Sequence, residues 1–539
     1  EEKQEILIKN TNKGYISDTN KYDYLYPSLD DPNFNIKITK KKEFFDTKYD
    51  GKIYNVETQA NVLCNAKFEL APHQLFVRNF LSFLTPYNSL LLYHGLGSGK
   101  TCSAIGIAEE MRDYLKQMGI TQRIIVVASP NVQENFKLQL FDERKLTLVD
   151  GLWDIRTCTG NKFIKEINPM NMKGLTKENV SRQIKRIINS AYLFLGYIEF
   201  ANYISKKSKI GPNDNAARMK KKLKKVFNNR LIIIDEVHNI RSTEENDNKR
   251  VAHELLKLVK NVDNLRLLLL SATPMFNTYK EIVWLINLMN INDNRPSINI
   301  KDIFDSQGNF KENENGDSIG KELLQRKATG YVSFVRGENP YTFPYRIWPS
   351  EFDSSKTFNT GTNRYPTLQM NNRPIVQGLE FVSVYLTQIG EYQQLAYDYI
   401  IQNIKNDIDS KDLEKQGKQF EDRESFGYTT LQRPLEALNI VYPNSDFKKD
   451  NVNIKYLVGK NGLKKIMNFK ESVNPPMRSK FSYKGDERIF SQENISKYSG
   501  KISSICSTII NSEGIILIYS QYIDGGLVPV ALALEEMGF

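Results

Sequence analysis

Short apolar runs alternate with amphipathic segments between residues 61 and 292. The runs predict buried strands at residues 90–93, 124–127, 192–195, 231–234 and 265–270. The first run is followed by apolar residues at helical spacing, namely Ala104, Ile107, Ala108 and Met111. Strands that alternate with helices are typical of a doubly wound parallel sheet, so the pattern predicts an α/β fold.

The rest of the chain shows a different pattern. Residues 1–60 are polar and read as an N-terminal extension, and residues 292–320 have the composition of a long exposed loop. Helical segments follow, and a last strand at 515–518 precedes a helix that begins near Val528. The sequence therefore predicts an extension (1–60), a first lobe (61–292), a linker with a helical region (293–500) and the start of a second lobe (501–539).

A glycine-rich string lies between the first predicted strand and its helix. It reads Gly95, Leu96, Gly97, Ser98, Gly99, Lys100, Thr101. Backbone N–H groups of such a loop, with the positive end of the helix dipole, bind a polyphosphate. We expect Lys100 to reach the outer phosphates and the Thr101 hydroxyl to ligate Mg²⁺. The general pattern has a glycine where this chain has His94, and from this string alone a turn that binds no nucleotide stays an alternative.

An acidic pair, Asp235 and Glu236, ends the strand predicted at 231–234. The ends of parallel strands deliver side chains to a ligand crevice. We expect Asp235 to hold Mg²⁺ through its water shell and Glu236 to polarise the attacking water. An isolated Asp-Glu pair also fits helix capping, but its place after a phosphate loop favours catalysis. His238 follows the pair and is expected among the catalytic residues with Lys100, Asp235 and Glu236, through polar coupling rather than metal coordination.

The string Ser271, Ala272, Thr273 closes the strand predicted at 265–270. Small hydroxylic residues at a strand end are suited to relay the state of a bound nucleotide to a neighbouring lobe. The three strings together predict a hydrolase that uses ATP and Mg²⁺.

Composition sets outer limits. The 539 residues exceed a single core, and the net charge of +11 suits binding to phosphate backbones. The four cysteines are far apart in sequence, which predicts a reducing compartment with neither a disulfide framework nor zinc. Cys102 is expected to pack within its helix. No stretch has the apolar length of a membrane span and the N-terminus lacks a signal-peptide core, so we expect a soluble intracellular protein.

A cationic run covers residues 216–225. A solvated helix face is the favoured interpretation, and a nucleic-acid contact is the alternative. Three of the four histidines, His73, His94 and His238, lie at or beside motifs, whereas His253 is expected on a helix surface.

The three strings resemble those of superfamily 2 helicases and translocases of the Asp-Glu-x-His group. Within it, the chain is similar to helicase-like ATPases of nucleocytoplasmic large DNA viruses, a group that includes poxvirus nucleoside triphosphatase I and the early transcription factor small subunit. Tyr93 and His94 match this group, as do the strings at 330–340, 344–347, 435–443 and 518–521. The same strings are also similar to those of the Swi/Snf class of translocases, whose helical protrusions between the lobes would correspond to residues 330–500.

The resemblance implies two RecA-like lobes around one ATP, with DNA, or alternatively RNA, running across both. It implies that Gln74 reads adenine, although a polar residue on an amphipathic helix explains it equally well. Nucleic-acid contacts are implied for loop residues at Ser129, Pro130, Asn131, Thr159 and Gly160. Viral RNA polymerase or other transcription factors are the implied partners, and the host cytoplasm, with packaging in the virion, is the implied location.

Members of this group carry a late arginine motif that neutralises charge during hydrolysis. No such string occurs in this sequence, so we expect the chain to be part of a longer polypeptide and these residues to form one wall of the ATP site. Three functions follow as hypotheses: a DNA translocase in viral early transcription, a strand-separating helicase of DNA or RNA, and a non-catalytic nucleic-acid-binding component of a virion or polymerase complex.

Overall fold

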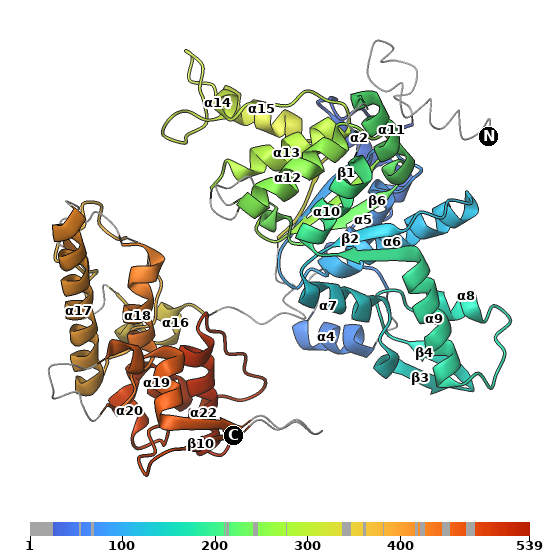
Figure 1. The fold of residues 1–539 in the computed structure, drawn as a ribbon. Coiled ribbons are helices and arrows are strands. Elements are labelled where there is room, and N and C mark those ends of the chain that lie inside the picture. Colours follow the sequence, from blue (N-terminus) through green and yellow to red (C-terminus); the bar gives the residue numbers. More distant parts are fainter. Residues whose placement is uncertain are drawn as a thin grey trace. The chain divides into compact units, whose positions relative to one another are not determined.

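The computed structural model describes two compact units, Glu1–Tyr345 and Arg346–Phe539 (Figure 1). Its described residues run from 25 to 539, except for 53–54, 66–68, 210, 212–214, 241–245, 276–277, 337–346, 359–362, 381, 416–418, 421–425, 445–452 and 471–479. Parts of the strings at 330–340 and 344–347 therefore lie outside the described residues. The four-part division of the chain stays a prediction.

A six-stranded parallel sheet forms the centre of the first unit. Its strand order is β5-β2-β6-β7-β1-β8. The strands are β1 (Ser89–His94), β2 (Ile124–Val127), β5 (Tyr192–Leu195), β6 (Leu231–Ile234), β7 (Arg266–Ser271) and β8 (Val332–Val335). The central strands are buried along their whole length, which explains their continuous apolar runs. The predicted α/β class with a doubly wound parallel sheet is confirmed.

Helices cover both faces of this sheet, because the chain reverses its direction of travel across it. The steps from β1 to β2 and to β5 run one way and the steps from β5 to β6 and β7 run back, so right-handed crossovers place their helices on opposite faces. The first group is α6 (Lys100–Gln117), α7 (Pro130–Leu140), α8 (Lys162–Ile167) and α9 (Lys177–Ala191). The second is α10 (Tyr197–Ser208), α11 (Ala216–Phe227), α12 (Asn246–Val259) and α13 (Glu281–Asn292).

Smaller elements complete the first unit. Phe34 and Phe44, from the segment before the first lobe, are buried in the same core as the sheet. The added elements are α2 (Phe34–Lys40), α3 (Lys42–Phe45), α4 (Val56–Asn65), α5 (Pro72–Phe80), the hairpin β3 (Leu146–Val149) and β4 (Leu152–Ile155), α14 (Ile300–Ile303) and α15 (Ile319–Ala328). The stretch expected as a loop at 292–320 thus contains α14 and a bridge between Phe304 and Phe310.

The second unit is mainly helical. It contains α16 (Pro349–Phe352), α17 (Glu391–Lys415), α18 (Tyr428–Asn439), α19 (Gly459–Ile466), α20 (Ile495–Tyr498), α21 (Gly500–Ile510), α22 (Val528–Glu536) and the antiparallel pair β9 (Met467–Lys470) and β10 (Lys480–Tyr483). Two apolar clusters hold it together, one around Ile400 and Leu457 and one around Tyr442 and Phe490.

Two sequence expectations are wrong. Residues 515–518 form no strand, since none of the described strands pairs with them, and Ile515 and Leu517 are fully exposed. Cys102 and Cys158 form a disulfide, although the cysteine spacing predicted none. The fold brings together residues 56 positions apart, with Cα atoms 5.2 Å from each other, and spacing alone could not reveal this. No helix among the described residues is long and apolar enough to cross a membrane.

Candidate functional site

The three predicted strings meet at one edge of the sheet. β7 lies between β1 and β6 and is parallel to both, so the carboxyl ends of the three strands point the same way. Tyr93 pairs with Ser271, and Ile234 pairs with Leu269. The phosphate loop, the acidic pair and the Ser-Ala-Thr string therefore lie together at this edge, where a parallel sheet offers its ligand crevice.

The phosphate loop has the backbone shape that its glycines allow. Gly97 and Gly99 have φ angles of 75° and 77°, in the left-handed region that glycine adopts at least cost. A Cβ at position 99 would also collide with Nε2 of Gln74. α6 begins directly at Lys100, so its free N–H groups and positive dipole end face the crevice.

Lys100 and the acidic pair are electrostatically coupled. The Lys100 ammonium donates to the carbonyls of His94 (2.9 Å) and Gly95 (3.2 Å). Burial lowers its pKa, and the nearby Glu236 and Asp235 oppose that shift. Burial, reinforced by the charge of Glu236, raises the pKa of Asp235 to about 6, and burial also raises the pKa of Glu236. Two carboxyl groups raised in this way are typical of a functional site.

The backbone at Glu236 is strained. Its φ of 47° lies in the left-handed region, which costs a non-glycine residue about 1 kcal/mol or more. The surrounding contacts hold it: the Glu236 N–H donates to Oδ1 of Asp235 (2.9 Å), and the Tyr197 hydroxyl donates to the Asp235 carbonyl (2.8 Å). The strain turns the chain sharply after β6 and brings both carboxylates to the crevice.

His238 joins the acidic pair to the Ser-Ala-Thr string. Its Nδ1 lies 3.0 Å from Oγ of Ser271 and 3.3 Å from Oε2 of Glu236. The same Ser271 hydroxyl accepts a bond from the N–H of Thr273 (3.0 Å), and Thr273 is exposed. A change at Glu236 therefore has a short path of polar contacts to an exposed loop. Ala272 lies between the two hydroxyl residues.

His73 and Gln74, at the start of α5, hold two successive carbonyls of the phosphate loop. Nε2 of His73 lies 2.8 Å from the Ser98 carbonyl, and Nε2 of Gln74 donates to the Gly99 carbonyl (3.1 Å). The carbonyl and N–H of a trans peptide point in opposite directions, so these bonds aim the N–H groups of Gly99 and Lys100 into the crevice. Gln74 is buried and its Oε1 accepts from Ala71 (2.9 Å); adenine reading by Gln74 stays a prediction.

His94, where the general pattern has a glycine, is fully buried and faces β8. Its Nε2 lies 2.9 Å from Oγ of Ser333, and its ring meets that of His73 edge-on at 5.7 Å. Burial is the main reason that its pKa falls to about 3, and His73 and Lys100 add to the shift. The departure from the usual motif thus joins the phosphate loop to the edge strand β8.

The expected nucleic-acid residues occupy two places. Ser129, Pro130 and Asn131 begin α7 directly after β2, at the same sheet edge as the crevice. Thr159 and Gly160 follow the hairpin, and the Thr159 hydroxyl donates to the Leu140 carbonyl (2.9 Å) at the other end of α7. The neighbouring Cys158 is bonded to Cys102 in the first turn of α6, which fixes this loop beside the phosphate loop. Their role as nucleic-acid contacts stays a prediction.

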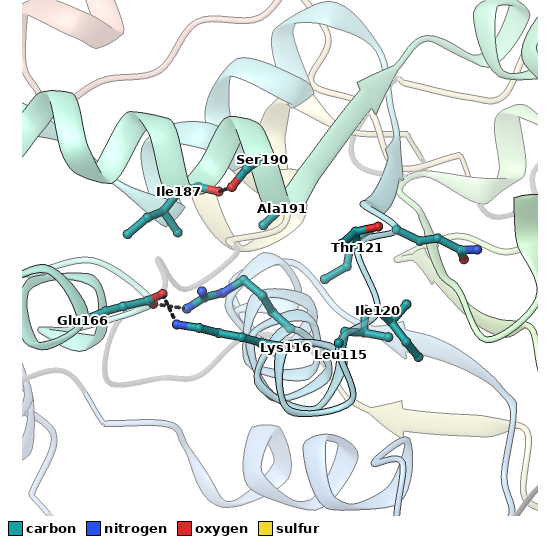
Figure 2. Close-up of a pocket in the computed structure, with 12 residues that line it drawn as sticks. Leu115, Lys116, Ile120, Thr121, Glu166, Ile187, Ser190 and Ala191 are labelled. Atoms are coloured by element: carbon teal, nitrogen blue, oxygen red, sulfur yellow. Dashed lines mark hydrogen bonds and ion pairs between the residues drawn. The ribbon is translucent and has the colours of Figure 1, made fainter. Parts of the chain in front are cut away.

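A separate pocket of about 470 Å³ lies at the far end of α6, away from the phosphate loop (Figure 2). Arg112 and Lys116 both bind Glu166, each at 2.9 Å. Figure 2 shows the side chains of Lys116 and Glu166 pointing toward one another. Arg112 also pairs with the buried Glu109. Its ionic groups are paired with one another, so we assign no chemistry to this pocket.

Sequence reasoning missed three residues around the crevice. Ser333 lies on β8, a strand that the pattern did not predict because its run is short and partly exposed. The Tyr49 hydroxyl lies 2.6 Å from Nδ1 of His73, although Tyr49 belongs to the polar N-terminal segment. The Tyr197 hydroxyl donates to the Asp235 carbonyl, a contact that no motif in the sequence indicates.

The donor set fits Mg²⁺ and ATP. The Asp235 carboxylate and the Thr101 hydroxyl are hard oxygen donors, which Mg²⁺ prefers, and they are the residues that would hold it. Lys100 and the N–H groups of the loop supply the positive charge that a triphosphate requires.

Comparison with known proteins identifies the domain. Residues 73–328 match the model of the SNF2-related domain. A putative ATP-dependent RNA helicase of Acanthamoeba polyphaga mimivirus is 25% identical over 475 residues, which cover 83% of this chain and 35% of that protein. A second mimivirus protein with the same description is 31% identical over 330 residues, covering 59% of this chain and 49% of the relative.

An early transcription factor large subunit homolog of African swine fever virus is 24% identical over 333 residues, covering 52% of this chain and 29% of that protein. The SWI2/SNF2 ATPase core of Sulfolobus solfataricus, solved with double-stranded DNA, has a TM-score of 0.28 and 15% identity over 69% of this chain and 57% of its own. The predicted resemblance is confirmed: residues 73–328 match the SNF2-related domain, and the relatives include proteins described as viral helicases. It spans between a third and a half of the length of the two mimivirus relatives.

Proposed function

We propose that this chain, whose residues 73–328 are an SNF2-related domain, is an ATP-driven DNA translocase that serves viral transcription. The observation that carries the proposal is the meeting of Lys100, Asp235, Glu236 and Ser271 at one edge of a parallel sheet. Each of these groups has a role either in hydrolysing the phosphoanhydride of ATP or in relaying the state of the bound nucleotide.

The chemistry requires positioning and charge neutralisation more than covalent steps. Lys100 and the loop N–H groups bind the outer phosphates, and bound Mg²⁺ adds positive charge there. Glu236 orients the attacking water and accepts its proton, and the raised pKa of this carboxyl makes it a better base than a solvated glutamate. Asp235 and Thr101 are the residues assigned to the metal.

Coupling to movement follows from the contacts of His238. When the group bound near Glu236 changes charge, the Glu236–His238–Ser271 chain transmits the change to the exposed Thr273. Relatives named helicases and a transcription factor homolog support action on nucleic acid in viral transcription. We assign the loops at Ser129–Asn131 and Thr159–Gly160 to the nucleic-acid backbone, where contacts position a motor without reading bases.

A displacement assay tests the motor activity. The full-length protein should remove a third strand from a DNA triplex in the presence of ATP while leaving a forked duplex intact. Matched DNA and RNA substrates are included because two relatives are described as RNA helicases. Unwinding of duplex DNA or RNA would show that the protein is a strand-separating helicase and not a translocase. ATP-independent binding without hydrolysis would support a purely binding role.

A further inference from the structure

Most of the net charge of the chain comes from one short stretch. Residues 206–225 contain nine cationic side chains and one acidic side chain, and so account for eight of the eleven net positive charges. None of these cations belongs to the candidate ATP site. The stretch covers the end of α10, the following loop and most of α11.

The two helices present these cations together. The Lys222 ammonium donates to the Lys209 carbonyl (2.9 Å), which places the end of α10 beside the middle of α11. Lys206 and Lys207 on α10, and Lys220, Lys221 and Lys225 on α11, are all exposed. We call these five residues the cationic surface.

The packing of α11 onto the first unit rests on apolar residues rather than on the cationic surface. α11 is anchored by Leu223 and Phe227, which are fully buried. Lys221 and Lys225 are four positions apart on one helix, a like-charge spacing that costs about 0.2–0.5 kcal/mol. Lys224 pairs with Asp263, but no described residue forms an ion pair with Lys220, Lys221 or Lys225. An uncompensated repulsion of this kind is expected where the neutralising partner lies outside the chain.

The cationic surface lies at the sheet edge opposite the ATP crevice. α10 begins at the carboxyl end of β5 and runs away from it, and α11 ends just before the amino end of β6. Gln122, two residues before β2, donates to the Lys225 carbonyl (3.2 Å), which fixes the end of α11 at the amino edge of the sheet. The surface is therefore distinct from the loops assigned to nucleic acid at the carboxyl edge.

We propose that the cationic surface is a second nucleic-acid site that binds the phosphate backbone of a duplex. Exposed lysines on adjoining helices match the closely spaced charges of a duplex, and they carry no groups suited to reading bases. The site raises the affinity for nucleic acid without taking part in ATP hydrolysis, because it is remote from Glu236. The inference rests on the proposed function only in taking nucleic acid as the polyanion.

Salt-dependent binding tests this site. A short labelled DNA duplex, and an RNA duplex of the same length, are titrated by fluorescence anisotropy without ATP between about 50 and about 200 mM salt. The variant combines Lys206→Gln, Lys220→Gln, Lys221→Gln and Lys225→Gln, since glutamine keeps the helix propensity and removes the charge. Each lost phosphate contact lowers the slope of log K against log salt by about 1, so we expect a slope shallower by about 3 to 4.

The matched control removes four charges from α9. It combines Lys177→Gln, Arg182→Gln, Lys185→Gln and Arg186→Gln, on a helix where Lys185 already pairs with Glu143 (2.7 Å). We expect this control to change the slope by less than about 1. Melting curves confirm that both proteins are folded. If the variant of the cationic surface does not fold, the unmodified protein is acetylated with and without duplex. Slower acetylation of Lys220 and Lys221 in the presence of the duplex then measures the same contact.

The outcomes separate this site from the ATPase. In ATP hydrolysis, the variant should keep its maximal rate at saturating DNA and need more DNA for half-stimulation. A salt-slope change in a protein that hydrolyses no ATP would support the second site and contradict the proposed function. Equal salt slopes for the variant, the control and the unmodified protein would overturn the second site. Polyglutamate that competes as strongly as unlabelled duplex would also overturn it, and would assign the surface to an acidic protein.

Discussion

Replacing His73 by alanine should weaken ATP binding about fivefold without unfolding the protein. The His73 ring aims one peptide of the phosphate loop, through its Nε2 contact of 2.8 Å with the Ser98 carbonyl. A carbonyl only accepts, so Nε2 carries the proton and Nδ1 accepts from the Tyr49 hydroxyl at 2.6 Å. Burial lowers the pKa of His73, which keeps this neutral form at pH 7.

The expected magnitude follows from one lost hydrogen bond. A neutral bond contributes about 1 kcal/mol net, which corresponds to about a fivefold change in Kd. Without the bond, the Ser98–Gly99 peptide can rotate, and the Gly99 N–H must be reoriented when phosphate binds. Tyr49 is 64% exposed, so its hydroxyl loses its partner at little cost, and the free energy of unfolding should change by less than about 1 kcal/mol.

Equilibrium titration with a fluorescent ATP analogue measures this effect. Two further variants sharpen it: His73→Gln places an amide N–H near the position of Nε2 and should restore affinity, whereas His73→Asn is too short to reach Ser98. The reasoning is refuted if His73→Ala binds within twofold of the unmodified protein, or if the glutamine variant binds no better than the asparagine variant.

Three further predictions concern the same unit. His94 has a pKa of about 3 when folded and 6.5 when unfolded, so its contribution to stability is lost as pH falls from about 6.5 towards 3. Urea titrations should show this as a free energy of unfolding that falls relative to that of His94→Gln by about 1.4 kcal/mol per pH unit below about 6. Ser271→Ala should keep basal ATP hydrolysis but reduce stimulation by DNA several-fold, and equal stimulation would contradict the path through His238. A digest without reducing agent should yield a peptide that links Cys102 to Cys158. Reduction should lower the free energy of unfolding by up to about 4 kcal/mol for a loop of this length. Unlinked peptides would instead show that both thiols are free.

The strands of the first unit were predictable because their physical cause is local. A strand buried on both faces must be apolar throughout, and the runs at 124–127 and 231–234 match β2 and β6 residue for residue. The chain order of the strings, together with parallel pairing, was then enough to place Lys100, Asp235 and Ser271 at one edge.

Features that depend on distant parts of the chain were not predictable. β8 pairs with β1 only because residues 332–335 return to the sheet after a long excursion, and the bond between His94 and Ser333 depends on that return. Likewise, Tyr49 meets His73 through the packing of the N-terminal helices, with no periodic signal in that segment. The apolar run at 515–518 shows the opposite failure: it has strand composition, but no described strand pairs with it.

Hydrolysis of ATP in the presence and absence of DNA tests the central claim most directly. The full-length protein should hydrolyse ATP faster with DNA, and Glu236→Gln should lose at least about a hundredfold in rate because its amide cannot accept a proton from water. The same variant should still bind ATP, whereas Lys100→Ala should bind it weakly. A Glu236→Gln protein with an unchanged rate would contradict the assignment of this crevice as the catalytic site.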